Sequence, residues 1–266
     1  MQKIISRILL VLLPGLVLIF SGCQSPKVQL VYDLGNGVQI EFVKIPAGSF
    51  MMGSPDNEAG GYMSQSPVRK VEISKPFLMG KFEVTQEQYI AVMGKNPSYF
   101  SGLKNPVECV SWYDAQKFCK KLSEITKMQV TLPTEAQWEY AARGESQSRF
   151  SFGDSENDLG DYCWYKDNSG DKTHPVGQKK PNKFGLYDMH GNVWEWCQDY
   201  YQDSYRNLAS KDPKGPSSST RRLIRGGSWY DSASLCRVAN RDTSGPDLRS
   251  FSGGFRVCDV VVSGLD

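Results

Sequence analysis

RRLIRGGSWYDSASLCRVANRDTSGPDLRSFSGGFR, residues 221–256, is the stretch that decides how this chain is built. Large or conformationally special residues alternate in it with short runs of small and polar residues. A segment rich in Gly, Ser and Asp near the end of a chain is usually a loose tail, but this one also carries Trp229, Phe255 and several arginines. This composition predicts a structured surface segment whose backbone is fixed by buried residues, as in a binding face.

The segment divides into two sets of positions. The framework set is Arg225, Gly226, Gly227, Ser228, Trp229, Cys236, Arg237, Arg241, Pro246, Asp247, Arg249, Gly254, Phe255 and Arg256. The second set, called the display positions below, stands between them and comprises Tyr230, Asp231, Ser232, Ser234, Leu235, Asp242, Thr243, Ser244, Gly245, Leu248, Ser250, Phe251, Ser252 and Gly253.

The display positions carry side chains suited to ligand contact. Tyr and Phe supply flat contact area at low entropic cost, and Ser, Asp and Thr supply adaptable hydrogen bonds. We therefore expect these positions to contact a ligand. Four arginines, Arg225, Arg237, Arg241 and Arg256, are expected to pair with carboxylates or backbone carbonyls beneath them. An ordinary surface loop with a Gly, Ser and Asp bias is the alternative.

The N-terminus has the pattern of a bacterial lipoprotein signal. Lys3 and Arg7 precede an apolar run at 8–20, and Ser21-Gly22-Cys23 resembles the lipobox, whose cysteine is lipidated and becomes the new N-terminus. The prediction is a signal peptide at 1–22, a lipidated tether at 23–28, and one domain at 29–266. A plain signal peptide or a membrane helix is the alternative, although the apolar run is short for a span. The expected location is a membrane-anchored lipoprotein at the outer membrane or cell surface.

Composition excludes several function classes. The net charge is +2 without a long basic block, so no nucleic-acid partner is expected. The chain has two histidines and no CxxC, which argues against the usual kind of zinc site. We find no Ser-His-Asp set, phosphate loop or glycosidase-like carboxylate pair. The 25 glycines and 12% aromatic residues favour a loop-rich fold over a helical bundle.

Several regular elements are visible in the sequence. Residues 28–45 alternate around Gly35-Asn36-Gly37 and predict a hairpin, and strand character returns at 50–53, 71–84, 222–229 and 253–262. Three helix starts are visible. Thr85 with Gln88 forms a capping-box pattern, and Thr134 with Gln137 opens another helix with Trp138 inward. After Ser111 a helix is predicted by one buried stripe at helical spacing, formed by Ala115, Phe118, Cys119 and Leu122. Residues 145–220 are expected to be mostly loop, anchored by tryptophans.

Seven blocks together resemble one family. They are FVKIPAGSFMMGS (42–54), FEVTQEQY (82–89), PVECVSWYDAQKFC (106–119), LPTEAQWEYAARG (132–144), GLYDMHGNVWEWCQD (185–199), RGGSW (225–229) and GGFR (253–256). In this order they resemble the formylglycine-generating enzyme, or sulfatase-modifying factor, domain. The resemblance implies an α+β protein with an irregular, loop-rich variant of the C-type lectin fold.

The family's enzyme oxidises a substrate cysteine to formylglycine with two cysteines that bind copper as thiolates. In an ungapped alignment from Gly226, one of them falls at Asp231 and the other at Cys236. A carboxylate does not replace a thiolate for Cu(I). The resemblance therefore argues against this activity here, and no catalytic residue or catalytic cofactor is expected.

The resemblance also implies a disulfide and a calcium site. It implies a disulfide between Cys119 and Cys258, and leaves Cys109, Cys163, Cys197 and Cys236 unassigned. It also implies a structural calcium site at Asp188, Gly191, Val193 and Glu195, for which a hard cation with oxygen ligands is suited. The alternative is that Asp188 and Glu195 only cap loops or pair with arginines.

The C-terminal segment resembles a narrower group, the variable proteins of diversity-generating retroelements, which include treponemal variable lipoproteins. There a reverse transcriptase introduces errors at template adenines, so AAY codons become many residues but never Lys, Glu, Gln, Met or Trp. All display positions carry residues that such codons can reach. The expected function is a surface-anchored lipoprotein with a variable region at 221–258 that binds a protein or cell-surface ligand. The alternatives are an exported formylglycine-generating-type oxidase and a structural envelope lipoprotein.

Overall fold

The computed structural model describes the backbone of residues 16–19 and the whole of residues 30–259, with the backbone of residue 29. Most of the predicted signal peptide, the predicted lipidation site Cys23 and residues 260–266 lie outside this part. Within it, the structure has no helix that combines the length and apolar character needed to span a membrane.

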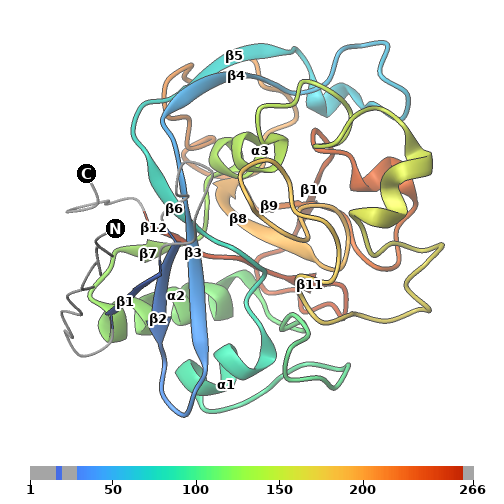
Figure 1. Cartoon of the computed structure of the whole chain (residues 1–266). Coiled ribbons are helices and arrows are strands. Elements are labelled where there is room, and N and C mark those ends of the chain that lie inside the picture. The colour runs from blue at the N-terminus through green and yellow to red at the C-terminus, as the bar shows by residue number, and fades with distance from the viewer. Residues whose placement is uncertain (1–15, 20–28, 260–266) are drawn as a thin grey trace, which may run out of the picture.

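The largest sheet has six strands in the order β1-β2-β3-β6-β12-β7, and its neighbours pair antiparallel. Its strands are β1 (Leu16–Ile19), β2 (Gln29–Asp33), β3 (Gln39–Ile45), β6 (Phe77–Gly80), β7 (Val130–Thr131) and β12 (Cys258–Asp259). β1 lies within the predicted signal peptide, so on that prediction the mature sheet begins at β2. Residues 221–256 are called the display segment below. Because β12 lies between β6 and β7, the chain directly after the display segment is fixed into this sheet (Figure 1).

The predicted hairpin at 28–45 is confirmed as β2 and β3. Gly35, Asn36 and Gly37 all have positive φ, which explains the glycines on either side of the asparagine. The Asp33 carboxylate accepts the Gly35 N–H at 2.8 Å and closes the turn.

A second sheet, in the order β10-β9-β8-β11, takes three of its four strands from the display segment. Its strands are β8 (Trp194–Tyr200), β9 (Arg222–Arg225), β10 (Arg241–Ser244) and β11 (Gly253–Gly254). A separate pair is formed by β4 (Gly48–Met52) and β5 (Arg69–Ile73). Residues 145–220 are mostly loop, as expected, and β8 is their one long strand. Most of its side chains are buried on both faces, so the strand carries no period-two pattern. β10 also escaped prediction, because an edge strand of sequence RDTS has no apolar alternation.

All three predicted helices are present, and each begins at a reciprocal capping box. They are α1 (Gln86–Met93), α2 (Trp112–Thr126) and α3 (Glu135–Arg143). The predicted stripe on α2 is buried, and Trp138 of α3 is fully buried. Between residues 29 and 259, three short 3-10 helices interrupt the loops: η1 (Met63–Gln65), η2 (Glu156–Asp161) and η3 (Ala233–Cys236).

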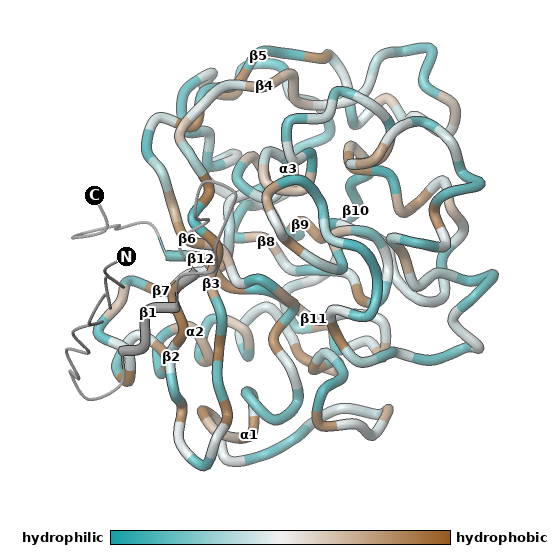
Figure 2. The backbone as a smooth tube through the Cα atoms, in the orientation of Figure 1, coloured by the Kyte–Doolittle hydropathy of each residue, from teal (hydrophilic) through white to brown (hydrophobic). Residues whose placement is uncertain are grey.

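Two main hydrophobic cores hold these elements together. One surrounds α3 and the β4–β5 pair, and the other joins α1 and α2 to the six-stranded sheet, with Phe118 packing on Phe255 at a ring distance of 5.3 Å. Figure 2 shows hydrophobic segments gathered around β6 and β12, while many outer loops are hydrophilic. The display segment contributes Phe255 to the second core, so its backbone is anchored at that point.

Candidate functional site

The framework tryptophan and phenylalanine of the display segment point inward. Trp229 is 4% exposed and Phe255 is fully buried. Gly227 has a φ of +76°, and a Cβ there would lie 2.8 Å from the sulfur of Cys236. Only glycine therefore fits this tight turn behind the surface.

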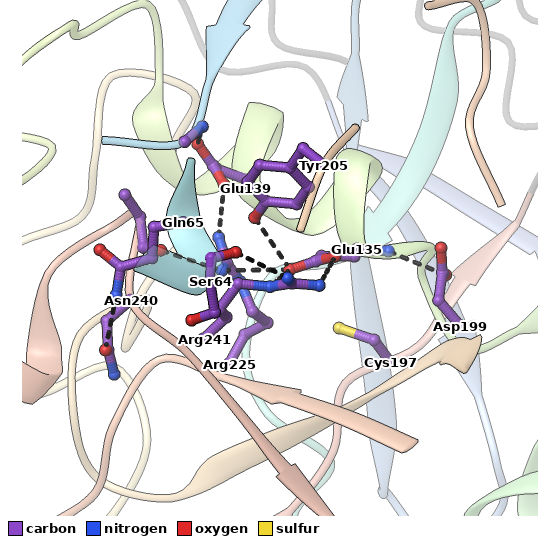
Figure 3. Close-up of polar contacts among 12 residues, drawn as sticks. Ser64, Gln65, Glu135, Glu139, Cys197, Asp199, Tyr205, Arg225, Asn240 and Arg241 are labelled. Atoms are coloured by element: carbon purple, nitrogen blue, oxygen red, sulfur yellow. Dashed lines mark hydrogen bonds and ion pairs between the residues drawn. The ribbon is translucent and has the colours of Figure 1, made fainter. Parts of the chain in front are cut away.

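Buried ion pairs hold the segment to α3 (Figure 3). Arg225 lies 2.6 Å from Glu139, which also pairs with Arg143 at 2.8 Å. Arg241 lies 2.7 Å from Glu135, whose carboxylate Arg225 also reaches at 3.3 Å. Burial alone would raise the pKa of Glu139, but the charges of Arg143 and Arg225 hold it below its usual value. The guanidinium groups of Arg225 and Arg241 therefore hold the display segment against α3.

The other two predicted framework arginines are also buried and paired. Arg237 forms an ion pair with Glu58 and donates to the Gln65 side chain at 3.2 Å. Arg256 makes two hydrogen bonds of 2.7 Å to Glu195. The prediction that Arg225, Arg237, Arg241 and Arg256 pair with groups beneath the display positions is confirmed.

Three large display side chains face outward. Tyr230 is 61% exposed, Leu248 is 55% exposed and Phe251 is 50% exposed. The Trp229 ring lies beneath two of them, with centroids 5.4 Å from Tyr230 and 5.9 Å from Phe251. A buried aromatic ring therefore supports an exposed aromatic patch.

The display positions are linked across the sheet. The Asp231 side chain is hydrogen-bonded to Ser228 and to Trp194, and Trp194 is the β8 partner of Gly253. The charge of Asp242 contributes to raising the pKa of Asp231, after burial as the main cause. Leu235, Asp242 and Thr243 line a surface depression together with Tyr62 and Tyr201. These contacts connect the two ends of the display segment.

Three details differ from the sequence-based assignment. Ser244 was expected to contact a ligand, but it is 7% exposed because it lies in β10 and faces inward. Asp247 and Arg249 were placed in the framework, yet both are exposed. Arg249 forms an ion pair of 2.8 Å with Asp114 at the start of α2 and donates to the Asp247 carbonyl at 3.3 Å.

Tyr99 belongs to the same surface and was missed by the sequence analysis. It lies in the loop after α1, is 75% exposed, and its ring centroid is 6.3 Å from Phe251. Phe100 beside it packs edge-on against Trp229 at 5.3 Å. Nothing local in the sequence of this loop marks Tyr99, since only the fold brings it to the patch.

The cysteines of the expected disulfide are both buried. Cys119 lies on α2 and Cys258 in β12, and both are unbonded in the structure. They lie close enough for the charge of Cys258 to contribute to raising the pKa of Cys119, after burial. Their pairing remains a prediction. Cys236, at the position aligned with the enzyme's second copper-binding cysteine, is fully buried and packs with Cys163.

The residues expected to hold calcium surround a buried group of charges. Glu195 accepts hydrogen bonds from Arg256 and, at 2.6 Å, from Trp138, so the alternative of arginine pairing holds for this carboxylate. Asp188 accepts the Gly177 N–H at 2.7 Å through one oxygen, while its Oδ1 is buried without a hydrogen-bond partner. Within residues 29–259 no group of three or more His, Cys, Asp or Glu side chains converges as a metal-ligand set.

Sequence reasoning missed Glu83 at this place. Burial raises its pKa well above the usual value, and the charges of Asp188 and Glu195 add to the effect. Three buried carboxylates thus lie near one guanidinium, that of Arg256. Burial thus disfavours the ionised forms of Glu83 and Asp188, and one oxygen of Asp188 is left without a hydrogen-bond partner.

The few helices, the short strands and the long anchored loops define a C-type lectin domain of the loop-rich kind. A family model described as "Sulfatase-modifying factor enzyme 1-like domain" matches residues 36–260, and the chain belongs to this family. The solved structure of Treponema denticola variable protein 1 superposes with a TM-score of 0.81 and 34% identity, covering 87% of this chain and 98% of that one.

Two curated relatives show the range of the family. The formylglycine-generating enzyme of Thermomonospora curvata is 30% identical over 80% of this chain and 91% of its own length. The inactive C-alpha-formylglycine-generating enzyme 2 of Bos taurus is 28% identical over 84% of this chain and 89% of its own length. The family therefore contains relatives named as enzymes and one named as inactive.

Proposed function

We propose that this protein is a membrane-anchored surface lipoprotein whose display positions, diversified by a retroelement, bind a protein or another cell-surface ligand. The observation that supports it best is the separation of roles along residues 225–256. Trp229 and Phe255 are buried, while Tyr230 and Phe251 are about half exposed or more. Such a surface can change its side chains without loss of the buried frame.

The exposed aromatic patch has the composition of a protein-binding centre. Tyr230 and Phe251 pack on Trp229, and Tyr99 extends the patch from the far side of Phe100 and Phe251. Aromatic side chains of this kind supply most of the affinity in many protein interfaces. The neighbouring Asp242, Thr243 and Ser232 are exposed or half-buried and add polar contacts at the rim.

The same surroundings argue against formylglycine-generating activity. Asp231 occupies the position that aligns with the enzyme's first copper-binding cysteine. Its carboxylate is hydrogen-bonded to Ser228 and Trp194. At the second aligned position the Cys236 thiol is buried against Cys163 rather than exposed. Cu(I) prefers thiolates, so this site lacks the ligand pair that the oxidation requires.

The function is tested by sequencing this gene in several isolates. We expect substitutions to concentrate at the display positions, with residues 225–229 and 254–256 unchanged, because the display positions other than Ser244 are exposed or partly exposed and the unchanged residues are buried. A near-copy of the segment with AAC or AAT at the display codons, beside a reverse-transcriptase gene, is expected nearby. Substitutions spread evenly over residues 29–259 would contradict the proposal.

We also propose a structural calcium ion at Asp188, Gly191, Val193 and Glu195. Asp188 supplies the buried oxygen that has no partner, and the ion would balance the carboxylates of Glu83 and Glu195. For an affinity typical of extracellular modules, addition of about 5 mM CaCl2 to EDTA-treated protein should raise Tm by roughly 5 °C. The matched variant Asp188→Asn should lose this response. An unchanged Tm of the wild-type protein after calcium addition would refute the site.

A further inference from the structure

Two cysteines far apart in the sequence lie together in the interior, and one of them belongs to the display segment. Cys163 follows η2 in the long loop before β8, and Cys236 is the last residue of η3. Both are fully buried, and they form a small hydrophobic cluster with Phe150 and Leu159, separate from the two main cores.

The backbone around the two sulfur atoms is tightly connected. Asn192 N–H donates to the Trp164 carbonyl at 2.8 Å, and Gly191 N–H donates to the Gly226 carbonyl at 2.8 Å. The turn at 190–192 thereby joins the segment of Cys163 to the segment of Cys236. His190 contacts the Cys236 carbonyl at 2.7 Å through Nδ1 and strengthens the same connection.

Glycines provide the space for both sulfur atoms. A Cβ at Gly191 would lie 2.5 Å from the Cys163 sulfur, and a Cβ at Gly227 would lie 2.8 Å from the Cys236 sulfur. The two thiols are within hydrogen-bond reach of each other. Of the other two unassigned cysteines, Cys109 is hydrogen-bonded to Glu108, and the Cys197 sulfur lies 4.0 Å from the Glu195 carbonyl oxygen.

We propose that Cys163 and Cys236 form a disulfide that fastens the display segment to the loop behind it. In the reaction the two thiols give up two electrons and two protons, and a protein disulfide or glutathione disulfide takes up both. The acceptor's S–S bond breaks and yields two thiols, while the S–S bond between Cys163 and Cys236 forms. The electron acceptor is supplied by an oxidising compartment outside the cytoplasm. The bond forms during folding, because both sulfur atoms are inaccessible once the loop has closed.

This disulfide gives Cys236 a role unrelated to copper. It closes a loop of about 70 residues, for which the chain-entropy treatment predicts a large stabilisation. It also links the backbone near Tyr230 and Leu235 covalently to the loop that contains Cys163. Substitutions of the exposed side chains therefore leave the position of this backbone unchanged. The inference does not depend on the identity of the ligand or on binding.

Peptide mapping of the full chain tests the bond directly. The protein is refolded with glutathione and glutathione disulfide, denatured without reductant, alkylated with N-ethylmaleimide and digested. We expect one linked peptide that contains Cys163 and Cys236, and alkylation at both residues only after reduction. Alkylation of both thiols without reduction, or linkage of either to another cysteine, would overturn the proposal.

Thermal unfolding supplies a second readout. Cys163→Ala, Cys236→Ala and the double variant should each lower Tm by the same amount, on the order of 10 °C, because any of them removes the same bond. The control Cys109→Ala should leave Tm unchanged, as its half-buried thiol lies outside the cluster. A double variant that loses the sum of two independent single effects would show packing losses without a shared bond and would contradict the proposal.

Discussion

Replacement of Glu139 by Gln is expected to lower the free energy of unfolding by about 3–5 kcal/mol, the usual effect of breaking a buried ion pair. Glu139 accepts from Arg225, Arg143 and the Gly53 N–H, all at 3.0 Å or less. The neutral amide leaves two buried guanidinium groups without their shared carboxylate. The measurement is urea unfolding followed by tryptophan fluorescence.

The matched control is Glu156→Gln. Glu156 pairs with Arg149 at 2.7 Å, but its side chain is 49% exposed. Water screens this pair, so its loss should change stability by less than about 1 kcal/mol. Equal effects of the two substitutions would show that the buried ion pairs do not support the display segment.

Adjacent residues in the display segment are expected to differ strongly in their contribution to stability. Trp229→Ala should cost about 3–5 kcal/mol because it empties a buried volume, whereas Tyr230→Ala should cost less than about 1 kcal/mol. Phe255→Ala and Phe251→Ala form a second pair with the same contrast. In each pair one ring is buried and the other is at least 50% exposed.

Unfolding curves of the four variants distinguish this account from an ordinary packed loop. In a packed loop Tyr230 and Phe251 would contribute to stability about as much as their buried neighbours. A large loss for Tyr230→Ala would therefore contradict the assignment of this residue to the exposed face.

The sequence predicts the helices well because the residues that start a helix are neighbours in the sequence. Thr85 and Thr134 form the capping boxes that the Gln three residues later indicates, and Ser111 begins a helix as expected, with Asp114 completing its box. β8 was not predicted, because its burial on both faces depends on segments remote in the sequence. β10 has only polar residues and is defined by its pairing with β9.

The site was predictable where side-chain chemistry alone decides the environment. Trp229 and Phe255 are buried as predicted, because large apolar rings favour the interior. The four arginines expected beneath the display positions are buried and paired as predicted, because a buried charge requires a partner. Ser244 was misplaced because a small polar residue is compatible with either side of an edge strand. Tyr99 and the contact between Cys163 and Cys236 depend on long-range folding, and local sequence does not indicate them.

Thermal unfolding of the triple variant Tyr230→Ala, Leu248→Ala, Phe251→Ala tests most directly whether a rigid frame carries replaceable groups. All three side chains are at least half exposed. We expect cooperative unfolding with a Tm within about 3 °C of the wild-type protein. Loss of the cooperative transition, or a Tm lowered as far as that of Trp229→Ala, would contradict the account.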